Sequence, residues 1–350
     1  MTSSPSTLHP EKAVMQQPSL PTDRAGAELA LGGPSLGTRV SEALRDPGRW
    51  ADWAALIGLV VLVIVFQSLN STFLSSTNIQ AMLVASAILI VLSVGQTFVI
   101  ATAGIDLSIA STMTLAAVVF GFAFVHGWGL VAAILLAICA GAFVGILNGT
   151  LISRGKITDF IVTLGTLSAA SGLALVIANG KPVTIISEPL LRLSTGTVGI
   201  FGYSFLIALA IAVVAHVVLF HTRFGTYVLA TGGNSEAANA SGINTKRIKT
   251  AVYAISGLLA GVGAILLVAR VGAAEPAANT SFLLNSVAAV VLGGVSLFGG
   301  RATIAGPVIG ALLLTALVNG LTLLGVSQFY QPLAVGIVVV LAAFLTRFQK

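Results

Sequence analysis

The chain is poor in charged residues and has a single cysteine, Cys139. Only 8% of its 350 residues are Asp, Glu, Lys or Arg, whereas 56% are apolar and the mean hydropathy is +1.02. A soluble protein of this composition would expose large apolar patches and aggregate. The scarcity of charge therefore excludes a soluble class, and the lone cysteine excludes a disulfide within the chain.

Motifs for bond chemistry are also missing. The sequence has no Gly-x-x-x-x-Gly-Lys-Ser/Thr segment to hold ATP phosphates. It lacks a nucleophile elbow, a Rossmann glycine pattern and any spacing typical of metal ligands. We therefore predict that the chain is not an enzyme and has no catalytic residues, cofactor or metal site. The formal charge of +6 does not indicate nucleic-acid binding, because the basic residues follow a membrane topology.

Apolar sequence is what the chain has in abundance. Runs of about 20 apolar residues, the length that crosses a hydrocarbon core of about 30 Å, recur from Ala51 to the C-terminus. The 38 glycines suit close packing of helices in lipid. We predict an all-α polytopic membrane protein of about ten transmembrane helices, some of them broken. The predicted spans are 51–69, 79–102, 105–125, 129–152, 158–178, 203–220, 251–271, 283–298 (short, and so broken or tilted), 304–325 and 329–346.

The basic residues are unevenly placed about these spans. With a cytoplasmic N-terminus, most Lys and Arg residues near the membrane fall inside, as the positive-inside rule requires. The inside group is Arg45, Arg49, Arg154, Lys156, Arg223, Lys246, Arg247, Lys249, Arg301, Arg347 and Lys350, and the outside group is Lys181, Arg192 and Arg270. We therefore predict that both termini are cytoplasmic. Residues 1–48, rich in Pro, Ser and Gly, are predicted to be a disordered tail, and residues 49–350 the transmembrane domain.

Two segments of the chain are similar to each other. Gly-Ile-Leu-Asn-Gly at 145–149 is similar to Ala-Leu-Val-Asn-Gly at 316–320. In the predicted topology the first lies on an inward-going span and the second on an outward-going one. This indicates an antiparallel internal repeat, which is common in transporters. Chance similarity between two Gly- and Ala-rich segments is the alternative.

Asp106 is the residue that costs most to place in lipid. At the bilayer centre a carboxylate costs about 2.5–3.5 kcal/mol on insertion scales, so it usually faces a bundle interior or a cavity. Gly104 and Ser108 indicate a helix break here, with a new helix whose N-terminus favours the carboxylate. Two interpretations stay open: an element of a translocation path or gate, and a helix cap at the membrane edge.

Other polar residues lie within the apolar spans. Asn148 and Asn319 occur late in glycine-rich spans, and each amide must find a partner in lipid, so we expect bonds across helices. Asp159 is interpreted as a cap or first-turn charge of a helix. The candidate residues for a translocation path are Gln96, Asp106, Ser108, Asn148, Asn285 and Asn319.

Residues 221–250 form a polar, basic segment that is unusually long for a connection between spans. It is predicted to form a short surface helix, with Gly232 and Gly242 allowing sharp turns before and after it. Its alanines at 237, 238 and 240 offer a smooth face to a groove on a partner. An ordinary solvated loop is the alternative.

Several motifs resemble those of bacterial ABC permeases of the ribose and related sugar type. The segment Gly-Gly-Asn-Ser-Glu-Ala-Ala-Asn-Ala-Ser-Gly-Ile at 232–243 resembles the coupling loop of that family. Further matches occur along the membrane portion: Ala-Gly-Ile-Asp-Leu-Ser at 103–108, Phe-Ile-Val-Thr-Leu-Gly-Thr at 160–166, His-Thr-Arg-Phe-Gly at 221–225, and Ala-Ala-Val-Val-Leu-Gly-Gly-Val-Ser-Leu-Phe-Gly-Gly at 288–300.

The resemblance implies a permease subunit of the bacterial cytoplasmic (inner) membrane that imports a small polar solute, with a monosaccharide expected, by alternating access. It implies cytoplasmic ATPase subunits, an extracytoplasmic solute-binding protein and a second permease chain, expected as a homodimer, as partners. The residues implied in ATPase coupling are Gly232, Gly233, Asn234, Ala237, Ala238, Ser241, Gly242 and Ile243. The alternatives are an ion-coupled secondary transporter that uses Asp106, and a membrane scaffold without transport.

Overall fold

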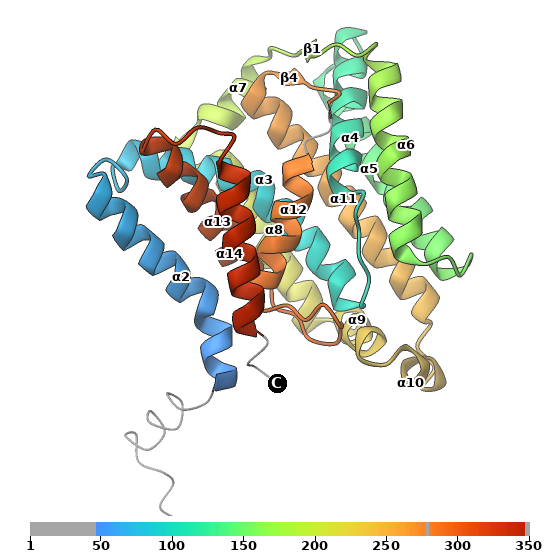
Figure 1. Cartoon of the computed structure of the whole chain (residues 1–350). Coiled ribbons are helices and arrows are strands. Elements are labelled where there is room, and N and C mark those ends of the chain that lie inside the picture. Colours follow the sequence, from blue (N-terminus) through green and yellow to red (C-terminus); the bar gives the residue numbers. More distant parts are fainter. Residues whose placement is uncertain (1–46, 278–279, 347–350) are drawn as a thin grey trace, which may run out of the picture. The chain divides into compact units, whose positions relative to one another are not determined.

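The computed structural model describes residues 47–277 and 280–346, and this part of the chain is mostly helical (Figure 1). The predicted tail lies outside the described residues, apart from Pro47 and Gly48, which begin the first described helix. The helices are α2 (Pro47–Leu69), α3 (Ser76–Ala101), α4 (Ile109–Val125), α5 (Leu130–Ser153), α6 (Asp159–Ile177), α7 (Glu188–Thr195), α8 (Tyr203–His221), α9 (Arg223–Gly233), α10 (Ser235–Ala240), α11 (Thr245–Val271), α12 (Thr280–Leu292), α13 (Ala305–Leu323) and α14 (Gln331–Thr346).

The described strands are short and form two antiparallel pairs. β1 (Val183–Thr184) pairs with β4 (Ala273–Ala274), and β2 (Thr197–Val198) pairs with β3 (Phe201–Gly202). The first pair ties the segment before α7 to the segment after α11. Figure 1 shows this pair and α7 at one end of the helices and α9 and α10 at the other. The segments predicted outside and the segments predicted inside are thus separated in space.

The predicted spans correspond closely to observed helices. Within the described residues 6 helices are long and apolar enough to cross a membrane, namely α3, α5, α6, α8, α11 and α13. Shorter apolar helical segments, in α2, α4, α12 and α14, occupy the other predicted spans. The all-α polytopic membrane fold is therefore confirmed, whereas the number of ten spans stays a prediction.

The eighth predicted span is broken, as expected. α12 ends at Leu292, and residues 293–304 are not helical. Gly294, Gly299 and Gly300 have φ values of 78°, 78° and 75°. This left-handed backbone is open to glycine and costly for other residues, so Gly294 allows the chain to leave the helix, and Gly299 and Gly300 form a turn further on.

α5 turns its small residues inward and its large apolar residues outward. The inward face includes Gly141, Gly145 and Gly149, which are buried or half-buried against α11. Val131 and Phe143 on the outward face are 70% and 66% exposed. This arrangement would be unfavourable in water, but lipid solvates the outward side chains, while small residues let the helix backbones approach. It is the packing expected of a membrane protein.

α3 is the central helix of the described bundle. Every residue from Ser86 to Ala101 is buried, and the helix packs against α8, α11, α12 and α13. Its sequence is apolar on all sides, which is typical of a helix without a solvent face. Ser75 caps its N-terminus by accepting a hydrogen bond from the Asn78 backbone N–H.

The same pattern of helix–helix contacts occurs twice along the chain. α5 packs on α11 and α4, and α4 also packs on α6; likewise α13 packs on α3 and α12, and α12 on α14. The two similar segments, 145–149 and 316–320, fall on the corresponding helices α5 and α13. This supports the internal repeat, while its antiparallel sense stays a prediction.

Candidate coupling and translocation site

The link between α3 and α4 crosses the interior without forming helix. Residues Thr102 to Ser108 form this link, and the backbone turns at Ala103, which has φ 57°. Non-helical backbone at membrane depth is tolerated only where protein groups satisfy its polar atoms. The predicted helix break is therefore confirmed.

Three helices hold the backbone of this link. The Gln96 side-chain amide of α3 donates to the Asp106 carbonyl at 3.0 Å, and the Tyr253 hydroxyl of α11 donates to the Ile105 carbonyl at 3.1 Å. Asp159 is the first residue of α6, as its interpretation as a first-turn charge requires. Its carboxylate also accepts the Ile105 N–H at 2.9 Å, a long-range contact that the sequence does not indicate.

The Asp106 carboxylate is buried and fully engaged by protein donors. Asp106 is only 2% exposed. Oδ1 accepts from the Ser108 N–H at 2.9 Å and from the Ser108 hydroxyl at 2.6 Å, and Oδ2 accepts from the Ser256 hydroxyl at 2.9 Å. The carboxylate thus holds Ser108, the residue that precedes α4, inside the described bundle.

The same network extends to two further helices. The Asn148 amide of α5 donates to the Ser108 hydroxyl at 2.9 Å, and the Thr166 hydroxyl of α6 donates to Asn148 Oδ1 at 2.6 Å. The expectation that Asn148 bonds across helices is confirmed. Because both oxygens of the Asp106 carboxylate already accept hydrogen bonds from protein donors, a coupling ion would have to compete with them. The geometry therefore disfavours the ion-coupled alternative.

The six path candidates divide into three groups. Gln96, Asp106, Ser108 and Asn148 meet in the buried network and hold helices together. Asn319 of α13 forms a reciprocal amide pair with Asn78 of α3, both contacts at 2.9 Å, which confirms its predicted bond across helices. Asn285 of α12 faces a cleft instead.

Sequence reasoning missed the partners in this network. Tyr253 and Ser256 lie three residues apart in the apolar α11, and Thr166 ends the 160–166 motif on α6. A hydroxyl within an apolar span needs a partner in lipid, and this signal could have drawn attention to them. The identity of the partner depends on the fold.

Residues 221–250 contain two short helices where one was predicted. α9 runs on directly from α8, and α10 follows Asn234, whose side chain accepts the N–H groups of Glu236 and Ala237 at 3.0 and 2.9 Å. Gly242 turns the chain after α10 with φ 86°, as predicted. α10 leaves most of its residues exposed.

Two expectations about this segment are wrong. Ala238 is 5% exposed, so it packs on its own chain and offers no face to a partner; Ala237 and Ala240 are exposed. Gly232 does not turn the chain but lies within α9, buried. The sequence pattern could not reveal either, because burial at these positions depends on where α9 and α10 fold back.

Gly232 is instead a point of close backbone contact. A Cβ atom at this position would overlap the Ala101 carbonyl oxygen, and it would lie 2.7 Å from the Gly300 nitrogen. The Gly300 N–H itself donates to the Ala101 carbonyl at 3.0 Å. The end of α9, the end of α3 and the glycine turn at 299–300 therefore meet, immediately before the link that carries Asp106.

A shallow concavity lies on the turn between α10 and α11. It measures about 440 Å³ and is lined by Asn239, Gly242, Ile243, Asn244 and Lys246. The Asn244 side chain caps α11 by accepting the Arg247 N–H at 3.0 Å. The turn is thus held in place while its rim stays accessible.

Comparison with known proteins places the chain in a family. Residues 78–343 match the model of the branched-chain amino acid transport system / permease component. The chain belongs to this family. The match covers the Asp106 link, the α9–α10 segment and the 293–304 turn, so the whole site lies within the shared region.

Curated members of the family are similar over most of their length. The ribose import permease of Bacillus subtilis is 40% identical over 299 residues, which cover 83% of this chain and 91% of the relative. The ribose import permease of Escherichia coli K12 is 38% identical, with 83% and 92% covered. The L-arabinose ABC transporter permease of Azospirillum brasilense is 34% identical, with 83% and 87% covered. No solved structure matches the chain.

Proposed function

We propose that the chain is the membrane-spanning permease of an ATP-driven importer for a monosaccharide such as ribose. The observation that carries the proposal is the similarity to permeases named for ribose and L-arabinose over more than four fifths of the chain. The chain contributes the path, and a separate cytoplasmic ATPase supplies the energy. Similarity to an ABC permease family does not favour the scaffold alternative.

A continuous series of contacts supports coupling through α9 and α10. An ATPase that grips α10 and the adjoining concavity would move α9, to which α10 is directly joined. Gly232 lies so close to Ala101 that a Cβ would not fit between them, and we expect movement there to pass to the link that begins at Thr102. Close-packed backbones cannot deform smoothly, so a push at one side shifts the neighbouring segment. Alternating access is the expected result.

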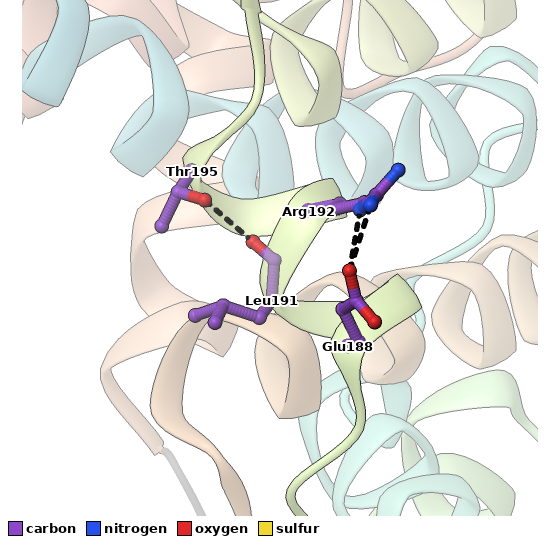
Figure 2. Close-up of polar contacts among 4 residues, drawn as sticks. All are labelled: Glu188, Leu191, Arg192 and Thr195. Atoms are coloured by element: carbon purple, nitrogen blue, oxygen red, sulfur yellow. Dashed lines mark hydrogen bonds and ion pairs between the residues drawn. The ribbon is translucent and has the colours of Figure 1, made fainter.

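The opposite end of the bundle offers a surface for a solute-binding protein. α7 is fixed by the buried Leu190, and its other face is polar. Figure 2 shows Glu188 and Arg192 paired on one side of α7, with a separation of 2.7 Å and side chains 72% and 76% exposed. Such an exposed pair contributes about 0–1 kcal/mol to stability. We expect the charges of this pair to orient the solute-binding protein as it docks, more than to stabilise the fold.

Reconstitution tests the proposal directly. The chain is placed in liposomes with an ABC ATPase and a sugar-binding protein from the same organism, and uptake of radiolabelled D-ribose, L-arabinose and D-allose is measured with and without internal ATP. We expect uptake of at least one sugar that requires ATP and does not respond to collapse of ion gradients. Uptake driven by an ion gradient alone, or no uptake of any of the three sugars, would contradict the proposal.

A further inference from the structure

A cleft runs between α12, α13 and α14. Its volume is about 660 Å³, which is within the range of about 300–1,000 Å³ typical of small-molecule sites. Ile105 and Leu107, the neighbours of Asp106 in the α3–α4 link, form part of its wall. Polar residues at the start of α12 and α14 and just before α14 also line it, namely Ser281, Asn285, Gln328 and Gln331.

The Asn285 amide is the notable polar group in this cleft. The residue is half-buried, and among the described residues no hydrogen bond to its side chain is found. Gln331 differs, because its amide donates to the Thr322 hydroxyl at 3.1 Å. A buried amide without a partner costs about 1–3 kcal/mol relative to water. In a membrane, that cost is met only if water or a ligand reaches the amide.

The composition of the wall indicates the class of ligand. Apart from these few polar groups the lining is aliphatic, and it carries no Asp, Glu, Lys or Arg. A charged solute would lose its hydration there without compensation. A neutral polyhydroxy solute fits better, since its hydroxyl groups pair with amides and its C–H faces pack on aliphatic side chains. A lipid tail would leave Asn285 unpaired.

The wall of the cleft is also connected to α9, through the α3–α4 link. Ile105 and Leu107 belong to the link that starts beside Ala101, where Gly232 of α9 makes backbone contact. Movement of α9 would therefore change the shape of the cleft. This connection favours a solute pathway over a groove that only holds lipid, because a pathway has to change shape when α9 moves.

We propose that this cleft is the surface on which the chain contacts its solute in transit, with Asn285 as the hydrogen-bonding residue and with selection for neutral, hydroxyl-rich solutes. The inference rests on the proposed import function and deepens it. It assigns the contact to the cleft lined mainly by α12 and α14, which the neighbours of Asp106 border, and not to the Asp106 carboxylate itself.

Thiol labelling tests whether the cleft is aqueous. The native cysteine is first replaced (Cys139→Ala), and Asn285→Cys is compared with Phe143→Cys in the middle of α5, a position 66% exposed on an apolar outer face. The probe is a water-soluble, sulfonated methanethiosulfonate, applied to the assembled importer. We expect labelling of Asn285→Cys at least tenfold faster than of Phe143→Cys. Equally slow labelling would show that lipid fills the cleft and would overturn the inference for any solute.

Transport measurements test the contact itself. Asn285→Leu keeps the branched shape and the number of heavy atoms and removes the amide, so ribose uptake should fall about tenfold in kcat/KM, as loss of one net hydrogen bond predicts. Asn285→Gln should retain more uptake than Asn285→Leu, and ATPase pull-down should be unchanged in both. Normal uptake by Asn285→Leu would overturn this inference alone, whereas absence of sugar uptake by the unmodified chain would overturn the proposed function and the sugar class together.

Discussion

Ser256 donates a hydrogen bond of 2.9 Å to Asp106 Oδ2, which joins α11 to a link 150 residues earlier in the chain. Ser108 serves the other carboxylate oxygen through both its N–H and its hydroxyl. The carboxylate therefore holds the start of α4 against α11. A buried polar group left without its hydrogen-bond partner costs about 1–3 kcal/mol, so this residue should matter for stability before it matters for transport.

Replacement of Asp106 should destabilise the protein in a graded way. Asp106→Ala leaves the buried Ser108 N–H without an acceptor and should lower the free energy of unfolding by about 1.5–3 kcal/mol. Asp106→Asn keeps one acceptor oxygen and should cost less. The measurement is the thermal midpoint of the purified protein in detergent. Glu188→Gln, at an exposed carboxylate on α7, is the control and should change stability by less than about 1 kcal/mol; equal midpoints for Asp106→Ala and the control would refute the role.

The contact between α5 and α11 should not tolerate a side chain. A Cβ on Gly257 would overlap the Gly141 carbonyl oxygen, so Gly257→Ala should force the helices apart and cost about 1–3 kcal/mol. Gly172→Ala on α6 is the matched control, since a Cβ there meets nothing within 4 Å. Its higher helix propensity should make it neutral or stabilising by up to about 1 kcal/mol. Membrane yield and thermal midpoint distinguish the two; a stable Gly257→Ala would argue against this packing.

Gly232 and Gly233 offer a test of coupling with adjacent residues. Gly232→Ala pushes against the Ala101 carbonyl and Gly300, whereas a Cβ on Gly233 comes no closer than 3.9 Å to a neighbour. We expect Gly232→Ala to bind the ATPase normally but to lose most ATP-driven uptake, and Gly233→Ala to behave like the unmodified chain. ATPase pull-down and uptake in liposomes are measured together. Equal uptake by the two variants would remove Gly232 from the coupling route.

The predicted topology can be checked at two exposed positions. In the Cys139→Ala background, Thr195→Cys on α7 should react in whole cells with a membrane-impermeant maleimide, and Ser235→Cys on α10 should react only after the membrane is opened. The uneven distribution of Lys and Arg is the physical basis for this expectation. Labelling of Ser235→Cys from outside would reverse the topology.

Much of the fold follows from the sequence because apolar length is a strong signal. In lipid the backbone must satisfy its own hydrogen bonds, so a run of about 20 apolar residues has few options besides a helix. The observed α3, α5 and α13 begin and end within a few residues of the predicted spans. The break at Asp106 also followed from local chemistry, since glycine, a carboxylate and serine in a row favour the start of a helix over its middle.

The candidate site could be predicted only in part. Motifs located the α9–α10 segment and Asp106, because both are polar residues in an apolar chain. They did not show that Gly232 is buried or that Ala238 faces its own chain, since these depend on how α9 returns to α3. A sequence motif identifies the type of residue at a position, but whether that residue is buried depends on which other segments pack against it.

The tertiary structure alone decided which polar residues share a network and which face the cleft. From the sequence, Asn148, Asn285 and Asn319 were equivalent amides in apolar spans. In the folded chain Asn148 forms a hydrogen bond with Ser108 and Asn319 forms one with Asn78, whereas Asn285 lines the cleft. The sequence shows that an amide in an apolar span needs a partner. It does not show which residue is that partner, because the partner lies on a helix far away in the chain and is brought close only by the packing of the helices.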